Sequence, residues 1–80
     1  MKTRFSENFL DKLDSFPLLV QNKFKKQLKF LISDIRYPSL RAKKYDETVG
    51  TWQARVDKSA RFYFLIEKDV YTLVDIRYHD

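Results

Sequence analysis

Apolar residues recur at helical spacing in two consecutive segments near the start of the chain. Ser6 is a suitable N-cap for the first segment, and Pro17, which a helix tolerates only in its first turn, separates the two. The spacing of three and four residues predicts one helix over residues 7–15 and a second over residues 17–36. The expected buried positions are Phe9, Leu10, Leu13 and Phe16 in the first helix, and Val20, Phe24, Leu28, Leu31, Ile32 and Ile35 in the second.

From Trp52 onward the apolar period changes to two, which is typical of strands. Apolar and polar positions alternate over residues 52–57, 61–67 and 70–77, and the residues between these segments are suited to tight turns. The pattern predicts a three-stranded meander, with residues 1–5 as a possible fourth strand. One face of this sheet should pack on the helices, and the other should be partly open and carry Arg55 and Arg61.

These elements predict an α+β fold, in which an N-terminal helical hairpin packs on a small antiparallel sheet of three to four strands. The length of 80 residues allows one domain, spanning residues 1–80, with a two-layer core. A hydrophobic content of 44% and a single Gly are consistent with a packed core rather than a disordered chain.

The absence of cysteine and the presence of one histidine restrict the possible chemistry. No disulfide, thiolate metal site or multi-histidine metal site can form, so we expect neither a metal nor a cofactor. The N-terminus lacks a signal-like apolar segment, and the longest apolar run, residues 62–66, is five residues long, too short to span a membrane. We therefore expect a cytoplasmic protein.

The positive charge is concentrated in one stretch of the chain. The net charge is +5, but residues 23–44 hold eight Lys and Arg residues against Asp34 alone, which gives +7. Such a stretch attracts nucleic acid or an acidic protein, although a solvated helix face has the same composition. Arg55, Arg61 and His79 fall in or just after three neighbouring strands, and a cluster of these cations would suit a phosphodiester.

Four segments carry a resemblance to a known family: Leu-Arg-Ala-Lys-Lys at 40–44, Trp-Gln-Ala-Arg-Val at 52–56, Ala-Arg-Phe-Tyr-Phe at 60–64 and Tyr-His-Asp at 78–80. In this order and spacing, behind two helices, they resemble the RelE/ParE family of bacterial toxin–antitoxin toxins. The resemblance implies a ribosome-dependent mRNA endonuclease that needs no metal, in which the substrate 2′-hydroxyl attacks the adjacent phosphate. It also implies an antitoxin partner, expected to be acidic and partly disordered, besides the ribosome and mRNA.

The same resemblance suggests roles for individual residues. Arg61 would stabilise the scissile phosphate, His79 would act as general acid or base, and Arg55 would position the substrate. RNA binding would fall to Arg41, Lys43, Lys44, Arg77 and Tyr78.

Two other functions remain open at this point. The chain could be a ParE-like toxin that inhibits DNA gyrase by binding, although such a toxin does not require a cluster of phosphate-binding cations. It could also be a shortened, inactive homologue that binds only antitoxin or ribosome, because related nucleases usually carry a tail with a Tyr beyond the position of Asp80.

Overall fold

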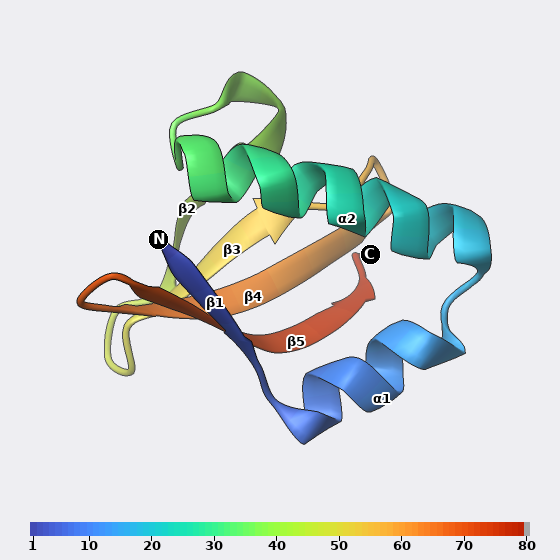
Figure 1. The fold of residues 1–80 in the computed structure, drawn as a ribbon, viewed down its shortest axis with the longest axis horizontal. Coiled ribbons are helices and arrows are strands. Elements are labelled where there is room, and N and C mark those ends of the chain that lie inside the picture. The colour runs from blue at the N-terminus through green and yellow to red at the C-terminus, as the bar shows by residue number, and fades with distance from the viewer. Residues whose placement is uncertain (80) are drawn as a thin grey trace.

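Residues 1–79, which the computed structural model describes, form two helices packed on one face of a five-stranded sheet (Figure 1). This confirms the expected α+β architecture. Asp80, the last residue of the Tyr-His-Asp segment, lies outside the described residues. The elements in chain order are β1 (Lys2–Phe5), α1 (Glu7–Ser15), α2 (Leu18–Ser33), the 3-10 helix η1 (Pro38–Leu40), β2 (Lys43–Asp46), β3 (Thr51–Arg55), β4 (Ala60–Glu67) and β5 (Val70–Tyr78).

The helical hairpin forms where the pattern predicts it. The Ser6 hydroxyl accepts a hydrogen bond from the Phe9 amide at 3.0 Å and caps α1, and Pro17 precedes α2. However, α2 ends at Ser33 rather than at residue 36. The Asp34 carboxylate accepts a hydrogen bond from the amide of Arg36 at 2.9 Å, and this bond stabilises a turn at the point where the helix would otherwise continue.

No helix in the described part of the chain is long and apolar enough to cross a membrane.

The sheet has more strands than expected and is not purely antiparallel. Its order is β1-β5-β4-β3-β2, and β1 runs parallel to β5, with Lys2 opposite Val70. No hairpin joins these two strands, so no turn fixes their relative direction. Residues 43–46, for which the pattern predicted no strand, form the edge strand β2 on β3. This strand is exposed throughout and polar on both faces, so it carries no apolar period that would predict it.

A β-bulge in β5 changes which of its side chains face the core. Tyr63 pairs with Asp75 and Phe64 pairs with Leu73, so Val74 is an extra residue between them. As a result Tyr71, Leu73 and Ile76 are buried together, although a strict period of two places Ile76 on the opposite face from the other two. The bulge also places Asp75 and Arg77 on the face opposite the core.

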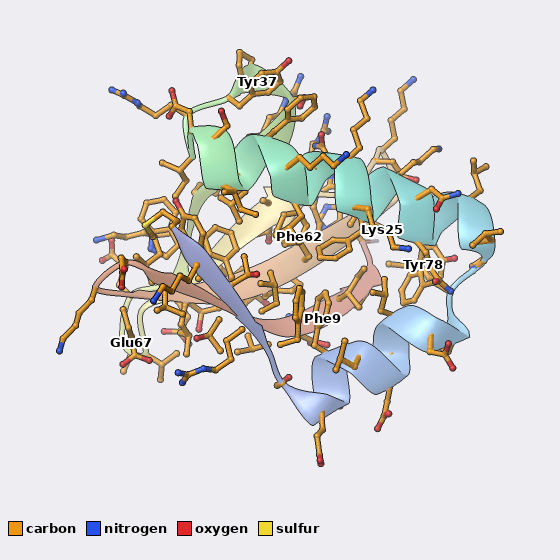
Figure 2. All side chains as sticks on the ribbon, viewed as in Figure 1. Phe9, Lys25, Tyr37, Phe62, Glu67 and Tyr78 are labelled. Atoms are coloured by element: carbon orange, nitrogen blue, oxygen red, sulfur yellow. The ribbon has the colours of Figure 1, made fainter. Side chains whose placement is uncertain are left out.

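The core is a chain of aromatic rings between the helices and the sheet (Figure 2). Phe9 lies 5.1 Å from Phe24, and Phe24 lies 5.2 Å from Phe62, between ring centroids. These contacts join α1, α2 and β4, and they fix the helices relative to the sheet. Two predicted core positions, Leu10 and Ile32, are exposed instead.

Candidate functional site

Three arginines lie side by side on the sheet face opposite the helices. Arg55 of β3 pairs with Arg61 of β4, and Arg61 pairs with Arg77 of β5. We call this set the arginine row. Like charges directly opposite each other destabilise a sheet, so the row suits an anionic ligand that would offset their repulsion. Desolvation, followed by the positive charges of Arg41 and Arg61, lowers the pKa of Arg55 from its ordinary value.

Arg61 is less available than the sequence suggests. Its side chain was expected on a partly open face, yet the residue is only 7% exposed. Its Nη1 donates to the carbonyl oxygens of Asp57 at 2.8 Å, Ala60 at 3.0 Å and Lys58 at 3.4 Å. The guanidinium therefore holds the β3–β4 loop in place, and its charge lies beneath the surface.

The β3–β4 loop is organised by a second charged group. Asp57 Oδ1 accepts hydrogen bonds from the amides of Ser59 and Ala60 at 2.8 and 2.9 Å. Partial burial acts to raise the pKa of Asp57, but these bonds and the contact with Lys23 outweigh it and hold the pKa below its usual range. The same loop anchors the C-terminal segment, because the backbone amide of His79 donates to the Ser59 carbonyl at 2.7 Å.

His79 lies on one side of a pocket of about 290 Å³ on this sheet face, which we call the His79 pocket. The structure brings His79 together with Arg77, which was expected only to bind RNA. Arg61 and Arg55, the expected partners of His79 in the cation cluster, do not line this pocket. The pocket is lined by Tyr45, Gln53, Tyr63, Arg77, Tyr78 and His79.

Arg77 is held in this pocket by aromatic rings. Its guanidinium carbon lies 4.4 Å from the ring centroid of Tyr63, and its Nη2 donates to the Tyr45 hydroxyl at 3.2 Å. The Tyr45 ring packs edge-on against Tyr63 at 4.9 Å. The sequence pattern did not indicate Tyr45, because it predicted no strand over residues 43–46 and so gave no direction for that side chain.

A chain of charged groups connects Arg77 to the first helix. Lys12 of α1 donates to Asp75 Oδ1 at 2.7 Å, and Asp75 Oδ2 lies 3.6 Å from Nε of Arg77. Asp75 Oδ1 also accepts a hydrogen bond from the amide of Ile76 at 2.9 Å. The carboxylate therefore fixes the orientation of Arg77 from the helix side. The pattern offered no signal for this contact, because Lys12 and Asp75 are 63 residues apart.

The remaining residues expected to bind RNA fall into different surroundings. Tyr78, which is 55% exposed, packs its ring on Phe16 at 4.8 Å and borders the His79 pocket. Lys43 pairs with Gln53 and so shares the sheet face of the pocket, whereas Lys44 pairs with Trp52 and lies on the opposite face. Arg41 follows η1 in the left-handed region, at φ 46°, close to Arg55.

Within residues 1–79, no group of three or more His, Asp or Glu side chains is arranged to hold a metal ion. The polar side chains that line the His79 pocket are one guanidinium, three phenols, the Gln53 amide and one imidazole. Such a set can bind an anion and transfer protons.

Comparisons with known proteins give similarity at the level of structure. Neither protein-family models nor curated proteins match the sequence. The YoeB/ParE toxin from Agrobacterium tumefaciens matches with a TM-score of 0.82 at 13% identity, over 100% of both chains. The YoeB–YefM complex from Staphylococcus aureus matches with a TM-score of 0.78 at 14% identity, over 100% of this chain and 98% of that chain.

An archaeal protein shares the same architecture. The RelE–RelB complex from Pyrococcus horikoshii OT3 matches with a TM-score of 0.79 at 13% identity, over 96% of this chain and 92% of that chain. The chain therefore has the fold of the RelE/ParE toxins. The Staphylococcus and Pyrococcus structures are complexes of toxin with antitoxin.

Proposed function

We propose that this protein is the toxin of a toxin–antitoxin pair and that it cleaves messenger RNA on the ribosome, in the cytoplasm. One observation carries the proposal more than any other: an imidazole, that of His79, and an oriented guanidinium, that of Arg77, line the same pocket. Arg77 belongs to the arginine row, whose other members, Arg61 and Arg55, follow on the next two strands. A binding protein that blocks an enzyme such as gyrase has no need of a proton-transfer group beside a phosphate-sized cluster of cations.

The reaction we propose uses the substrate's own 2′-hydroxyl. Its oxygen forms a bond to the adjacent phosphorus, the bond from phosphorus to the 5′-oxygen breaks, and the products carry a 2′,3′-cyclic phosphate and a 5′-hydroxyl. One proton must leave the 2′-oxygen and one must reach the 5′-oxygen. His79 supplies one of these two transfers, because an imidazole nitrogen can accept a proton and an imidazole N–H can donate one.

The cations stabilise the charge that grows on the phosphorane. The Arg77 side chain is 48% exposed, and it meets the phosphate oxygens through the N–H groups that Tyr45 and Asp75 leave free. Arg61 adds positive charge from beneath the surface and holds the loop on which His79 is anchored. Arg55, at the end of the row, positions the RNA backbone.

We assign the outlying residues to holding RNA. Tyr78 stacks on a base beside the pocket, and Lys43, on the pocket's face of β2, contacts the backbone. Arg41 and Lys44 contact the RNA of the message or the ribosome farther out. The antitoxin we propose is an acidic, partly disordered segment that covers the arginine row and so competes with RNA.

Expression in bacterial cells tests this proposal. The wild-type protein should arrest growth with loss of translation, while His79→Ala and Arg77→Ala should restore growth at equal protein levels. Lys25→Ala, an exposed cation of α2 outside the pocket, is the matched control and should remain toxic. Growth arrest with double-strand DNA breaks and continued translation would favour gyrase inhibition instead. Normal growth with the folded wild-type protein would favour an inactive homologue.

A further inference from the structure

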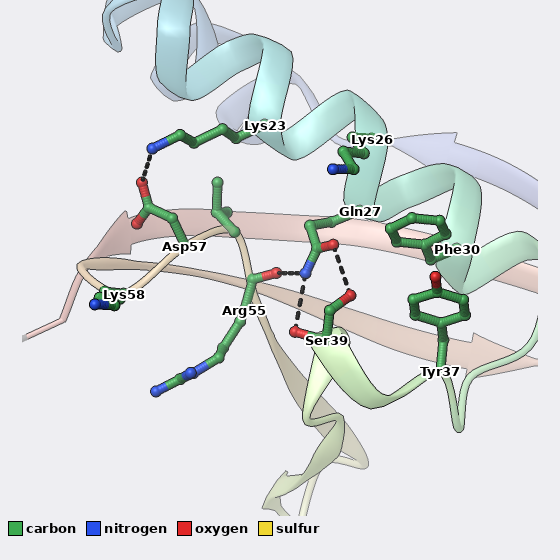
Figure 3. A pocket seen from close by; sticks show the side chains of 10 residues that line it. Lys23, Lys26, Gln27, Phe30, Tyr37, Ser39, Arg55, Asp57 and Lys58 are labelled. Atoms are coloured by element: carbon green, nitrogen blue, oxygen red, sulfur yellow. Dashed lines mark hydrogen bonds and ion pairs between the residues drawn. The ribbon is translucent and has the colours of Figure 1, made fainter.

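A second pocket, of about 500 Å³, lies between α2, η1 and the loop that follows β3 (Figure 3). We call it the α2 groove. Its floor is Gln27, whose side-chain amide donates to the carbonyls of Ser39 at 3.0 Å and Arg55 at 2.9 Å, and whose Oε1 accepts from the Ser39 hydroxyl at 3.0 Å. These bonds tie α2, η1 and β3 together, so the groove is a fixed part of the fold.

The lining of the α2 groove is strongly cationic. Lys23 and Lys26 come from one side of α2 and Lys58 from the β3–β4 loop. Arg55 lines the groove from β3, with its guanidinium pointing away from α2 (Figure 3). Among residues 1–79, Asp57 is the one acid that lines it, and it contacts Lys23 at 3.5 Å. Among the described residues, the other three cations have no carboxylate within 4 Å, so their charge is available to a ligand.

An aromatic pair forms one end of the groove. The rings of Phe30 and Tyr37 are stacked, with centroids 3.9 Å apart and planes 7° from parallel, and Tyr37 is 40% exposed. Unpaired cations along a groove that ends at an exposed aromatic ring are the combination by which proteins hold single-stranded nucleic acid, through phosphates and through base contacts.

We propose that the α2 groove binds the phosphate backbone of single-stranded RNA that extends beyond the His79 pocket. The inference rests on the function proposed above and adds a second contact for the same substrate. The position of the α2 groove relative to the His79 pocket supports RNA rather than an acidic peptide as the ligand. Arg55 lines the groove, Arg77 lines the His79 pocket, and Arg61 lies between them in register. An RNA strand cut at the pocket continues past it. Arg61 is buried between the two sites, and Arg55, two strands away from Arg77, lies at the edge of the groove.

Binding of a short RNA to purified full-length protein tests the inference. The probe is a fluorescein-labelled 12-nucleotide RNA with 2′-O-methyl groups, which cannot be cleaved through the 2′-oxygen, and its affinity is measured by anisotropy across a range of NaCl concentrations. The double variant Lys26→Ala/Lys58→Ala should bind about tenfold more weakly at 0.1 M salt. Its log–log salt slope should fall by about 1.4, because each phosphate contact on a single strand contributes about 0.7.

The matched control is Lys25→Ala/Lys29→Ala. It removes the same charge, with both substitutions on α2 but outside the groove, and we expect an affinity change of less than threefold. Equal losses in the two double variants would show that net charge alone binds RNA, and would overturn the inference. A glutamate-rich 12-residue peptide serves as the competing ligand. If Lys26→Ala/Lys58→Ala abolishes its binding but not that of RNA, the groove is a peptide site and the inference is wrong.

The two proposals fail in different ways. If the protein binds RNA through the α2 groove but never cleaves a message on the ribosome, the proposed nuclease function is wrong and the groove proposal stands. If cleavage requires His79 but the RNA affinity does not depend on Lys26 and Lys58, the groove proposal is wrong and the nuclease proposal stands.

Discussion

The guanidinium of Arg77 rests on the ring of Tyr63, 4.4 Å from guanidinium carbon to ring centroid. The two residues differ sharply in exposure, since Tyr63 is 5% exposed and the Arg77 side chain is 48% exposed. The buried ring is a fixed support, and the cation above it keeps one side open to the pocket. Arg77 is therefore oriented before any ligand binds, which reduces the entropy lost on binding.

Replacing Tyr63 tests whether this support matters for activity. Tyr63→Leu removes the ring beneath Arg77, and we expect RNA cleavage to fall by about tenfold, the effect of about 1.4 kcal/mol of lost orientation and cation–π attraction. Tyr63→Phe keeps the ring and should retain most of the activity. Equal activity of the Leu and Phe variants in a cleavage assay, both being folded, would show that the ring does not orient Arg77.

The Lys12–Asp75–Arg77 chain makes a different prediction. Asp75→Asn and Lys12→Ala should each lower cleavage several-fold by loosening Arg77. The free energy of unfolding should change by less than about 1 kcal/mol, because partly exposed ion pairs contribute little. Cleavage assays and urea unfolding of the same preparations separate the two effects. A large loss of stability in Lys12→Ala would instead make the pair a structural link between α1 and β5.

Arg61 should contribute to stability as well as to the site. Arg61→Met leaves the carbonyl groups of the β3–β4 loop without their charged donor, and we expect a loss of about 1–3 kcal/mol in the free energy of unfolding. Arg55→Met, in the adjacent position of the arginine row, is the control and should change stability by less than about 1 kcal/mol. If the two variants are equally stable, the bonds of Arg61 to the loop do not hold the fold.

Asp57 gives a prediction about pH. Its pKa is lowered in the folded protein, so its stabilising effect is present above the unfolded pKa, about 4, and is lost as the pH falls through the folded value. Asp57→Ala should therefore lose more stability at pH 7 than in strong acid, with about 1–3 kcal/mol expected at pH 7. Asp57→Asn keeps the oxygen that accepts from Ser59 and Ala60 and should lose less. Urea unfolding between pH 2 and pH 7 provides the test, and an identical loss at every pH would contradict this account.

Much of the fold could be predicted because its signals are local. The cap at Ser6, the break at Pro17 and the two-residue turn between β4 and β5 are each determined by neighbouring residues. The extra strand β2 could not be predicted in this way, because an exposed edge strand has no buried face to impose a period. The bulge at Val74 shifts the alternation of β5 without any local marker in the sequence.

The candidate site could be predicted only in outline. Neighbouring strands made the proximity of Arg55 and Arg61 predictable, and the structure pairs them directly. The burial of Arg61 depends on carbonyl groups of the loop, whose direction no sequence pattern indicates. The position of Arg77 in the lining of the pocket depends on the bulge, which places it on the same face as Tyr63.

Cleavage on a programmed ribosome tests the central claim most directly. Purified protein is added to ribosomes that carry a defined messenger, with wild type compared against His79→Ala and the control Lys25→Ala. We expect wild type and Lys25→Ala to cut the message and leave 2′,3′-cyclic phosphate and 5′-hydroxyl ends, and His79→Ala to be slower by about 100-fold or more. An uncut message with folded protein and active ribosomes, or cutting by His79→Ala at the wild-type rate, would contradict the proposal.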